Sequence, residues 1–128
     1  MLALHDRRIE RALFISPVLD LERLIQDMMR RAGVTERDLR EKGEIPADGG
    51  ETLSWEYLQF VREHPIPWNV PTEILCAEND ALISRQTVDF FVRTHDARLT
   101  VMENGEHWFH TEAQLVVLDA WMAKAIKI

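Results

Sequence analysis

The chain has 128 residues, of which 46% are hydrophobic and 29% are charged, and this length suffices for one globular core but not for two ordinary domains. Its 15 lysine and arginine residues against 22 aspartate and glutamate residues give a net charge of −7, which argues against nonspecific binding to nucleic acid or to an anionic membrane surface. No apolar stretch is long enough to span a bilayer, and the sequence begins without the pattern of a signal peptide. We therefore expect a cytoplasmic protein.

The first elements in chain order are predicted to be a strand and a helix. Residues 9–15 form a short apolar run that ends at a Ser-Pro pair, which is typical of a buried strand. Over residues 21–32 the apolar side chains recur at helical spacing, with Asp20 as the N-cap and Gly33 as the stop signal. This segment is the clearest helix in the sequence.

The next region is predicted to be mostly polar until a further helix begins. Thr35 and Asp38 resemble a capping box that opens a short polar helix, and residues 44–50 look like turn material. No core residue is expected from residues 35–50. Residues 51–64 carry a wide apolar face, which predicts a helix that covers another element.

The second half of the sequence alternates between strand and helix patterns. Residues 72–77 and residues 98–102 are predicted strands, and Ser84 is placed to cap a helix between them. Thr111 and Gln114 form a second capping box before the last helix. The buried face of that helix is expected to comprise Leu115, Leu118, Trp121, Met122 and Ala125. This alternation predicts an α/β fold, with a three-stranded parallel sheet, right-handed crossovers and flanking helices.

Three polar side chains follow the three predicted strands. Ser16 ends the first strand, Asp80 lies shortly after the second, and His107 lies shortly after the third. In an open parallel sheet the functional groups gather at the carboxyl ends of the strands. Since the second and third strands are joined by a single helix, we expect Asp80 and His107 to lie within hydrogen-bonding reach, as in a pair that orients a histidine general base.

With these residues in place, the sequence resembles the C-terminal half of the alpha/beta hydrolase family. Residues 77–80, Ala-Glu-Asn-Asp, match the end of the family's penultimate strand and its catalytic Asp, here Asp80. Residues 105–107, Gly-Glu-His, match the loop that carries the catalytic His, here His107, before a long C-terminal helix. The resemblance covers nearly the whole chain, and it is the combination and order of these motifs that make it specific.

The resemblance implies a domain layout and a site. The chain is expected to be a single partial alpha/beta hydrolase domain over residues 1–128, in which residues 18–67 form a helical cap-like insertion and residues 68–128 supply the acid strand, the histidine strand and the C-terminal helix. Asp80 and His107 are the implied catalytic residues. The implied activity is that of a serine hydrolase of the carboxylic ester hydrolase type, and an ester-like small molecule is the implied substrate.

The serine nucleophile of this family is missing from the sequence. Family members carry it in Gly-x-Ser-x-Gly, whereas Ser16, Ser54 and Ser84 all lack glycines two positions to either side. We therefore expect the isolated chain to be catalytically inactive, and Met1 to be an internal methionine of a longer protein whose N-terminal half completes the site. The alternative hypothesis is a noncatalytic remnant or interaction module that retains the fold for assembly.

Several other residues are candidates for a catalytic or binding role. Ser16 is a candidate substitute nucleophile, although Pro17 after it cannot donate an oxyanion amide. Glu78 is the competing acid for His107. Cys76, the only cysteine, lies inside a predicted buried strand, where an inert thiol is the usual outcome. An apolar acyl pocket is the alternative to an ordinary core for a set of aromatic side chains, namely Trp55, Tyr57, Phe60, Trp68, Trp108 and Phe109.

No cofactor and no metal are expected. His107, His110 and Glu112 are close in sequence, but the sequence places no third ligand for a metal beside the two histidines. A homodimer or higher oligomer is expected, because the first strand would be left with an open apolar edge that no proline or inward charge protects.

Overall fold

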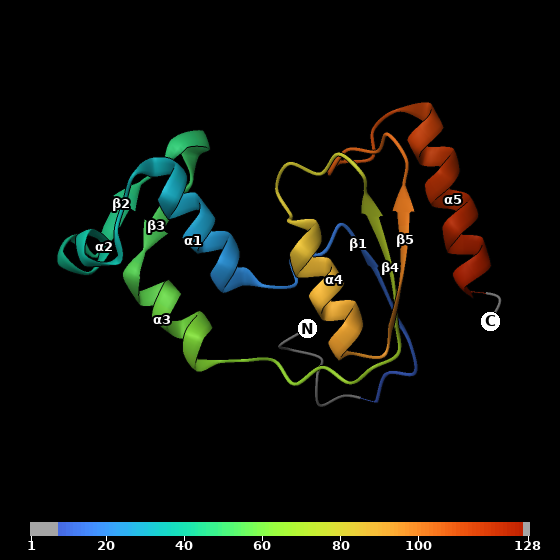
Figure 1. The fold of residues 1–128 in the computed structure, drawn as a ribbon, viewed down its shortest axis with the longest axis horizontal. Helices are drawn as coiled ribbons and strands as arrows, with labels where there is room; N and C mark the ends of the chain where they lie inside the picture. The colour runs from blue at the N-terminus through green and yellow to red at the C-terminus, as the bar shows by residue number, and fades with distance from the viewer. Residues whose placement is uncertain (1–7, 127–128) are drawn as a thin grey trace. The chain divides into compact units, whose positions relative to one another are not determined.

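The computed structural model describes residues 8–126, and the chain divides into two compact units. Among the described residues, unit 1 combines residues 8–19 with residues 67–126, and unit 2 comprises residues 20–66. Figure 1 shows the helices and strands of both units. None of the helices in the described part of the chain is long and apolar enough to cross a lipid bilayer.

Unit 1 contains a three-stranded parallel sheet in the order β1-β4-β5. The strands are β1 (Ala12–Ile15), β4 (Thr72–Ala77) and β5 (Ala97–Met102), and β4 is the central one. The predicted α/β class with a parallel sheet is thereby confirmed. The first strand is shorter than the predicted residues 9–15, because its pairing begins only where the Ala12 amide donates to the Pro71 carbonyl at 2.9 Å.

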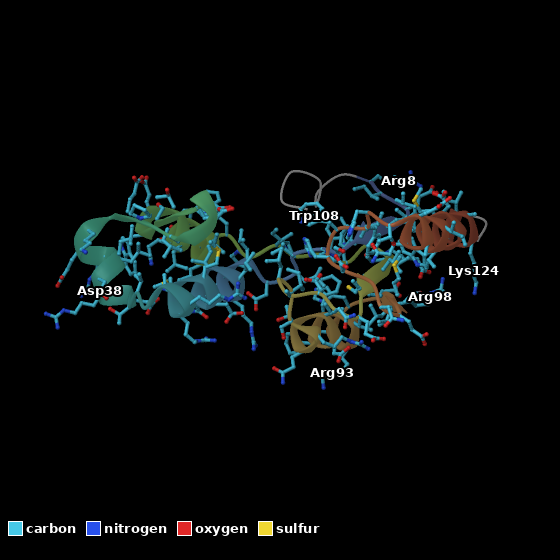
Figure 2. The ribbon with its side chains drawn as sticks, turned by 90° about the horizontal axis from the view of Figure 1, so that it is seen from above. Arg8, Asp38, Arg93, Arg98, Trp108 and Lys124 are labelled. Atoms are coloured by element: carbon cyan, nitrogen blue, oxygen red, sulfur yellow. The ribbon has the colours of Figure 1, made fainter. Side chains whose placement is uncertain are left out.

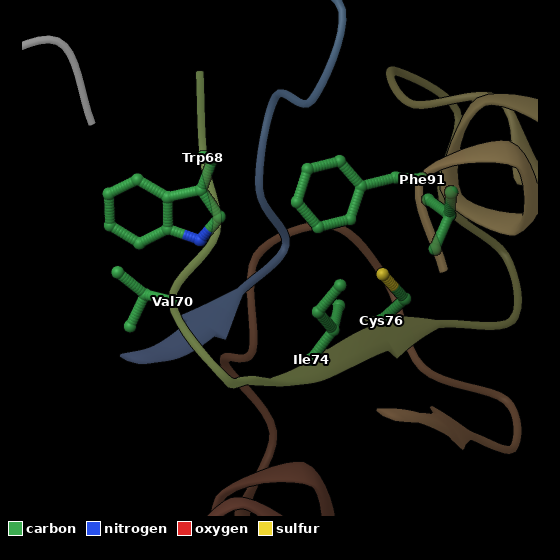
Figure 3. Close-up of a cluster of buried hydrophobic side chains, with 6 residues drawn as sticks. Trp68, Val70, Ile74, Cys76 and Phe91 are labelled. Carbon is green, nitrogen blue, oxygen red and sulfur yellow. The ribbon is translucent and has the colours of Figure 1, made fainter. Parts of the chain in front are cut away.

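Two helices, α4 (Arg85–Thr94) and α5 (Glu112–Ile126), cover opposite faces of this sheet (Figure 1). Side chains alternate between the faces of a strand, so neighbouring residues of β4 enter different clusters. The cluster on the α4 side, drawn in Figure 3, is formed by Trp68, Val70, Ile74, Cys76, Val88 and Phe91. The cluster on the α5 side is formed by Leu75, Met102 and Trp121.

The N-terminus of α5 is built as predicted, but its buried face is not. The Gln114 amide donates to the Thr111 hydroxyl at 3.2 Å, and the Gln114 side-chain oxygen accepts from the His110 amide at 3.1 Å. These bonds draw Gln114 inward, and Leu115, which was expected in the core, is 44% exposed. The remaining members of the predicted face are buried or partly buried, namely Leu118, Trp121, Met122 and Ala125.

Unit 2 contains three helices and a two-stranded antiparallel sheet. Its elements are α1 (Leu21–Ala32), α2 (Glu36–Lys42), β2 (Glu44–Pro46), the 3-10 helix η1 (Asp48–Gly50), β3 (Thr52–Ser54) and α3 (Trp55–Glu63). Asp20 caps α1 by accepting from the Arg23 amide at 3.0 Å, and Gly33 ends it with φ +68. The predicted capping box of Thr35 and Asp38 is also present. Its backbone hydrogen bond from Thr35 lowers the pKa of Asp38 below the ordinary value.

Three expectations for unit 2 are corrected by the structure. Residues 44–50 are not only turn material, because β2 pairs with β3 and places Ile45 opposite Leu53. The predicted helix over residues 51–64 begins later, at Trp55, since the preceding residues belong to β3. The segment expected to lack core residues contains Leu39, which is fully buried, and the core of unit 2 consists of Ile25, Met29, Leu39, Leu53 and Leu58.

Candidate active site

The loops after β4 and β5 are joined by backbone hydrogen bonds beyond the ends of the two strands. The Glu78 amide donates to the Met102 carbonyl at 3.0 Å, and the Asn79 amide donates to the Gly105 carbonyl at 2.9 Å. Because both loops are fixed to each other, the residues that follow have defined positions. These residues are Asp80 in the first loop and His107 in the second.

Asp80 is held by the start of the segment that leads to α4. Its Oδ1 accepts from the Leu82 amide at 2.8 Å and from the Ile83 amide at 3.0 Å. The side chain is only 6% exposed. Because two amides donate to Oδ1, the carboxylate cannot rotate freely. The direction in which Oδ2 points is therefore fixed as well.

The free oxygen of Asp80 meets the imidazole of His107. The distance between His107 Nδ1 and Asp80 Oδ2 is 2.8 Å, and the His107 side chain is 14% exposed. A carboxylate oxygen accepts hydrogen bonds, so Nδ1 is the donor in this contact, and in the neutral form of the imidazole Nε2 is the nitrogen with the lone pair. Within residues 8–126 no hydrogen bond engages Nε2. The contact predicted from the strand order is present, and its geometry is that of an acid that orients a histidine base.

Gly105 explains why His107 follows β5 at this spacing. The Gly105 amide donates to the Met102 carbonyl at 3.1 Å, which closes a tight turn directly after the strand. A methyl group on Gly105 would lie 3.0 Å from the Met102 carbonyl oxygen and 3.1 Å from the Met102 Cβ, closer than such atoms ordinarily approach. A larger residue at position 105 would therefore require the turn to shift against Met102 at the end of β5.

The three serines of the chain are occupied in other ways. The Ser16 hydroxyl donates to the backbone carbonyl of His107 at 2.9 Å. Ser54 caps α3 by accepting from the Tyr57 amide, and Ser84 caps α4 by accepting from the Gln86 amide. Among the residues that the structure describes, no serine hydroxyl is hydrogen-bonded to the His107 imidazole. The substitute-nucleophile hypothesis for Ser16 therefore has no supporting contact.

Cys76 faces the α4 side of β4, where it is 5% exposed. Burial, and secondarily the nearby negative charge of Asp80, raises the pKa of the Cys76 thiol to about 11. At neutral pH the thiol is protonated and sheltered, so it is a poor nucleophile. The buried-strand interpretation of this residue agrees with its surroundings.

The remaining acids and histidines near the site are exposed. Glu78 lies at the surface, and Asp80, not Glu78, is hydrogen-bonded to His107. His110 bonds the Trp108 carbonyl at 2.9 Å and lies 3.7 Å from Glu106, with both side chains 58% exposed. In the described part of the chain, no three His, Cys, Asp or Glu side chains are grouped so that they hold a metal ion.

The aromatic residues predicted to form either an acyl pocket or ordinary core are divided between the two units. Trp68 belongs to the cluster on the α4 side of the sheet, whereas Phe109 packs on the α5 side. Trp108 is 74% exposed and projects from unit 1 (Figure 2). Its ring meets the His107 ring edge to face, with the centroids 4.9 Å apart. The other three aromatic residues, Trp55, Tyr57 and Phe60, lie on α3 in unit 2.

A groove of about 220 Å³ lies elsewhere in unit 1, beside β5 and α5. Its charged lining residues are Glu73, Arg98 and Lys124, and the last two are labelled in Figure 2. Arg98 forms an ion pair with Glu73 across the two strands. This groove contains neither Asp80 nor His107, so it is separate from the candidate site.

Comparison with known proteins identifies the fold. No family model and no curated protein matches the sequence. Among solved structures, alpha/beta hydrolase domain-containing protein 10 from mouse matches with a TM-score of 0.75 at 16% identity, over 98% of this chain and 55% of that protein. Est1E from Butyrivibrio proteoclasticus matches with a TM-score of 0.68 at 16% identity, over 99% of this chain and 55% of that protein.

At these identities the similarity establishes the fold alone. The chain has the alpha/beta hydrolase fold, as its sequence predicted, and it spans about half the length of the solved structures that it matches.

Proposed function

We propose, from this fold and the geometry of the site, that His107 is the general base and Asp80 its orienting acid in a serine hydrolase that acts on carboxylic esters, and that this chain is the C-terminal part of that enzyme. The observation that carries the proposal is the 2.8 Å contact between His107 Nδ1 and Asp80 Oδ2, in which the second carboxylate oxygen is held by two amides.

The chemistry assigned to these residues is acyl transfer in two steps. His107 Nε2 takes the proton of a serine hydroxyl as the serine oxygen attacks the ester carbonyl carbon, and the resulting imidazolium is stabilised by Asp80. The same proton then passes to the departing alcohol oxygen, which leaves an acyl-serine. In the second step Nε2 takes a proton from water as the water oxygen attacks the acyl carbon. The imidazolium then returns this proton to the serine oxygen as the bond from carbon to the serine oxygen breaks, which releases the carboxylic acid and restores the serine hydroxyl.

The nucleophile and the oxyanion amides have to come from elsewhere in the complete protein. In the described residues the serines make structural hydrogen bonds, and no Gly-x-Ser-x-Gly segment occurs in the sequence. The matched structures are about twice as long as this chain, which supports a missing N-terminal half. Est1E has been solved with ferulic acid bound, and a carboxylic acid is the kind of product that the proposed ester hydrolysis would release.

The chain alone is expected to show no turnover of activated esters such as p-nitrophenyl acetate, because it lacks a nucleophile and an oxyanion hole. The measurement is the initial rate of the wild-type chain beside that of His107→Ala, and the two rates should agree with the buffer control. A turnover that Ser16→Ala abolishes would contradict this expectation, because it would make Ser16 the nucleophile.

A second candidate function is that of a noncatalytic assembly module. The observation in its favour is that β1 pairs with β4 on one side, while no strand of the described residues pairs with its other side. Ile15 on this strand is 43% exposed. Other apolar residues of unit 1 are exposed as well, namely Leu115 at 44%, Val116 at 63% and Val117 at 42%. An open strand edge is a template for pairing with another chain.

For this second candidate we expect a homodimer or higher oligomer with β1 at the contact. Light scattering coupled to size-exclusion chromatography measures the mass directly, and Ile15→Lys should shift the oligomer toward the monomer by placing a charge at the edge. A folded monomer of 15.0 kDa at low micromolar concentration would exclude this function.

A further inference from the structure

Ser16 connects two parts of the chain that are far apart in sequence. It lies at the carboxyl end of β1, and its hydroxyl donates to the backbone carbonyl of His107, 91 positions later, at 2.9 Å. The Ser16 amide continues the sheet by donating to the Leu75 carbonyl at 2.9 Å. Ser16 is thus fixed to the central strand by its backbone and to the histidine loop by its side chain.

The backbone of Ser16 has an uncommon conformation. Its φ is +47, in the left-handed region that is sterically unfavourable for a residue other than glycine. Such a conformation persists only where the surrounding structure enforces it, and it is often found beside functional sites. Here it turns the chain out of β1 at the position from which the hydroxyl reaches the His107 carbonyl.

The histidine loop has anchors on both sides of His107. Before it, Gly105 is held by Met102 and Asn79 through its amide and carbonyl, and after it Phe109 packs on the α5 side and the His110 amide donates to the Gln114 side chain. Within residues 8–126 the His107 carbonyl accepts no other hydrogen bond. The bond from Ser16 therefore fixes the backbone of His107, and the bond to Asp80 fixes its ring.

We propose that Ser16 is a positioning residue, which sets the backbone of His107 through its carbonyl and so keeps Nδ1 against Asp80 and Nε2 directed at the reacting group. This role rests on the function proposed above. It differs from a nucleophilic role, since the hydroxyl proton of Ser16 is donated to a carbonyl and takes no part in the chemistry. Removal of the Ser16 hydroxyl should therefore change the position of the His107 imidazole, although this hydroxyl bonds the backbone of His107 and not its ring.

The test uses the whole chain and two substitutions that remove the hydroxyl. Ser16→Ala leaves the strained backbone in place, whereas Ser16→Gly also relieves the strain, because glycine adopts the left-handed region at no steric cost. Ser54→Ala is the matched control: it removes a serine hydrogen bond of unit 2 that does not involve His107. Thermal unfolding of all variants is measured first, so that changes in stability are known.

The readout is the signals of the His107 ring nitrogens, and of the protons bonded to them, in two-dimensional long-range 1H–15N NMR spectra of the labelled chain. The wild-type chain and Ser54→Ala should show the Nδ1–H tautomer with a downfield proton bonded to Asp80. Ser16→Ala and Ser16→Gly should both lose that signal, even if the glycine variant is as stable as the wild type. Retention of the signal in the glycine variant, its loss in Ser54→Ala, or its absence in the wild type would overturn the proposal.

A kinetic measurement separates this proposal from the proposed function. In the complete enzyme Ser16→Ala should lower kcat by about 10-fold to 100-fold with little change in KM, as misplaced catalytic groups do. If His107→Ala abolishes activity while Ser16→Ala retains full kcat, the catalytic assignment stands and the positioning role fails. If the NMR effect is found and no ester is hydrolysed, the positioning role stands and the assigned reaction fails.

Discussion

Replacing His107 with alanine is expected to lower kcat for ester hydrolysis by about 10⁶-fold in the complete enzyme that supplies a nucleophile, and Asp80→Asn by about 10⁴-fold. The loss of kcat is expected to be larger for His107→Ala than for Asp80→Asn, because the imidazole transfers the proton whereas the carboxylate orients the ring. The measurement is kcat on a p-nitrophenyl ester with both variants confirmed as folded.

The matched control for this experiment is His95→Ala. His95 lies just before β5, at the opposite end of the strand from His107, where it stacks on Phe91. It should therefore retain full kcat. Equal activities of the wild type and His107→Ala would contradict the catalytic assignment and favour the assembly module.

Leu75→Ala is expected to have the largest effect on stability, a loss of about 2–5 kcal/mol in the free energy of unfolding. Leu75 is fully buried in the central strand and packs against Met102 and Trp121, so its removal leaves a cavity between the sheet and α5. Leu115→Ala makes the same chemical change at a side chain that is 44% exposed, and its cost should stay within about 0.5 kcal/mol.

Urea denaturation of both variants gives the comparison. If Leu115→Ala costs as much as Leu75→Ala, then Leu115 is covered in solution, and the face of α5 that carries it forms a contact. That result would be expected together with an oligomer.

The sequence predicts best those features that local chemistry determines. Asp20 and Gly33 delimit α1 as expected because a cap and a left-handed glycine act within one helical turn. The meeting of Asp80 with His107 was also predictable, since neighbouring parallel strands place the loops at their carboxyl ends side by side.

The features that sequence patterns missed depend on distant contacts. The hairpin of β2 and β3 consists of two three-residue strands, and it is stabilised by packing against residues such as Leu39, which no short-range pattern reveals. Leu115 was misplaced because α5 is apolar on nearly all sides, so its spacing does not select one face. The hydrogen bond from Ser16 to the His107 carbonyl joins residues 91 positions apart, and no local sequence motif predicts it.

The order of segments in unit 1 has a consequence for how the chain folds. β1 pairs directly with β4, yet unit 2 is inserted between the two strands. Closing this long connection as a flexible loop slows folding, because its entropy is lost before the strands gain their contacts. If unit 2 folds first, the flexible part of the connection between β1 and β4 shortens about sixfold, because only the residues outside unit 2 remain flexible. This lowers the entropic cost of closing the connection by about 1.6 kcal/mol. Mutations in the small core of unit 2 should therefore slow the formation of the sheet in unit 1.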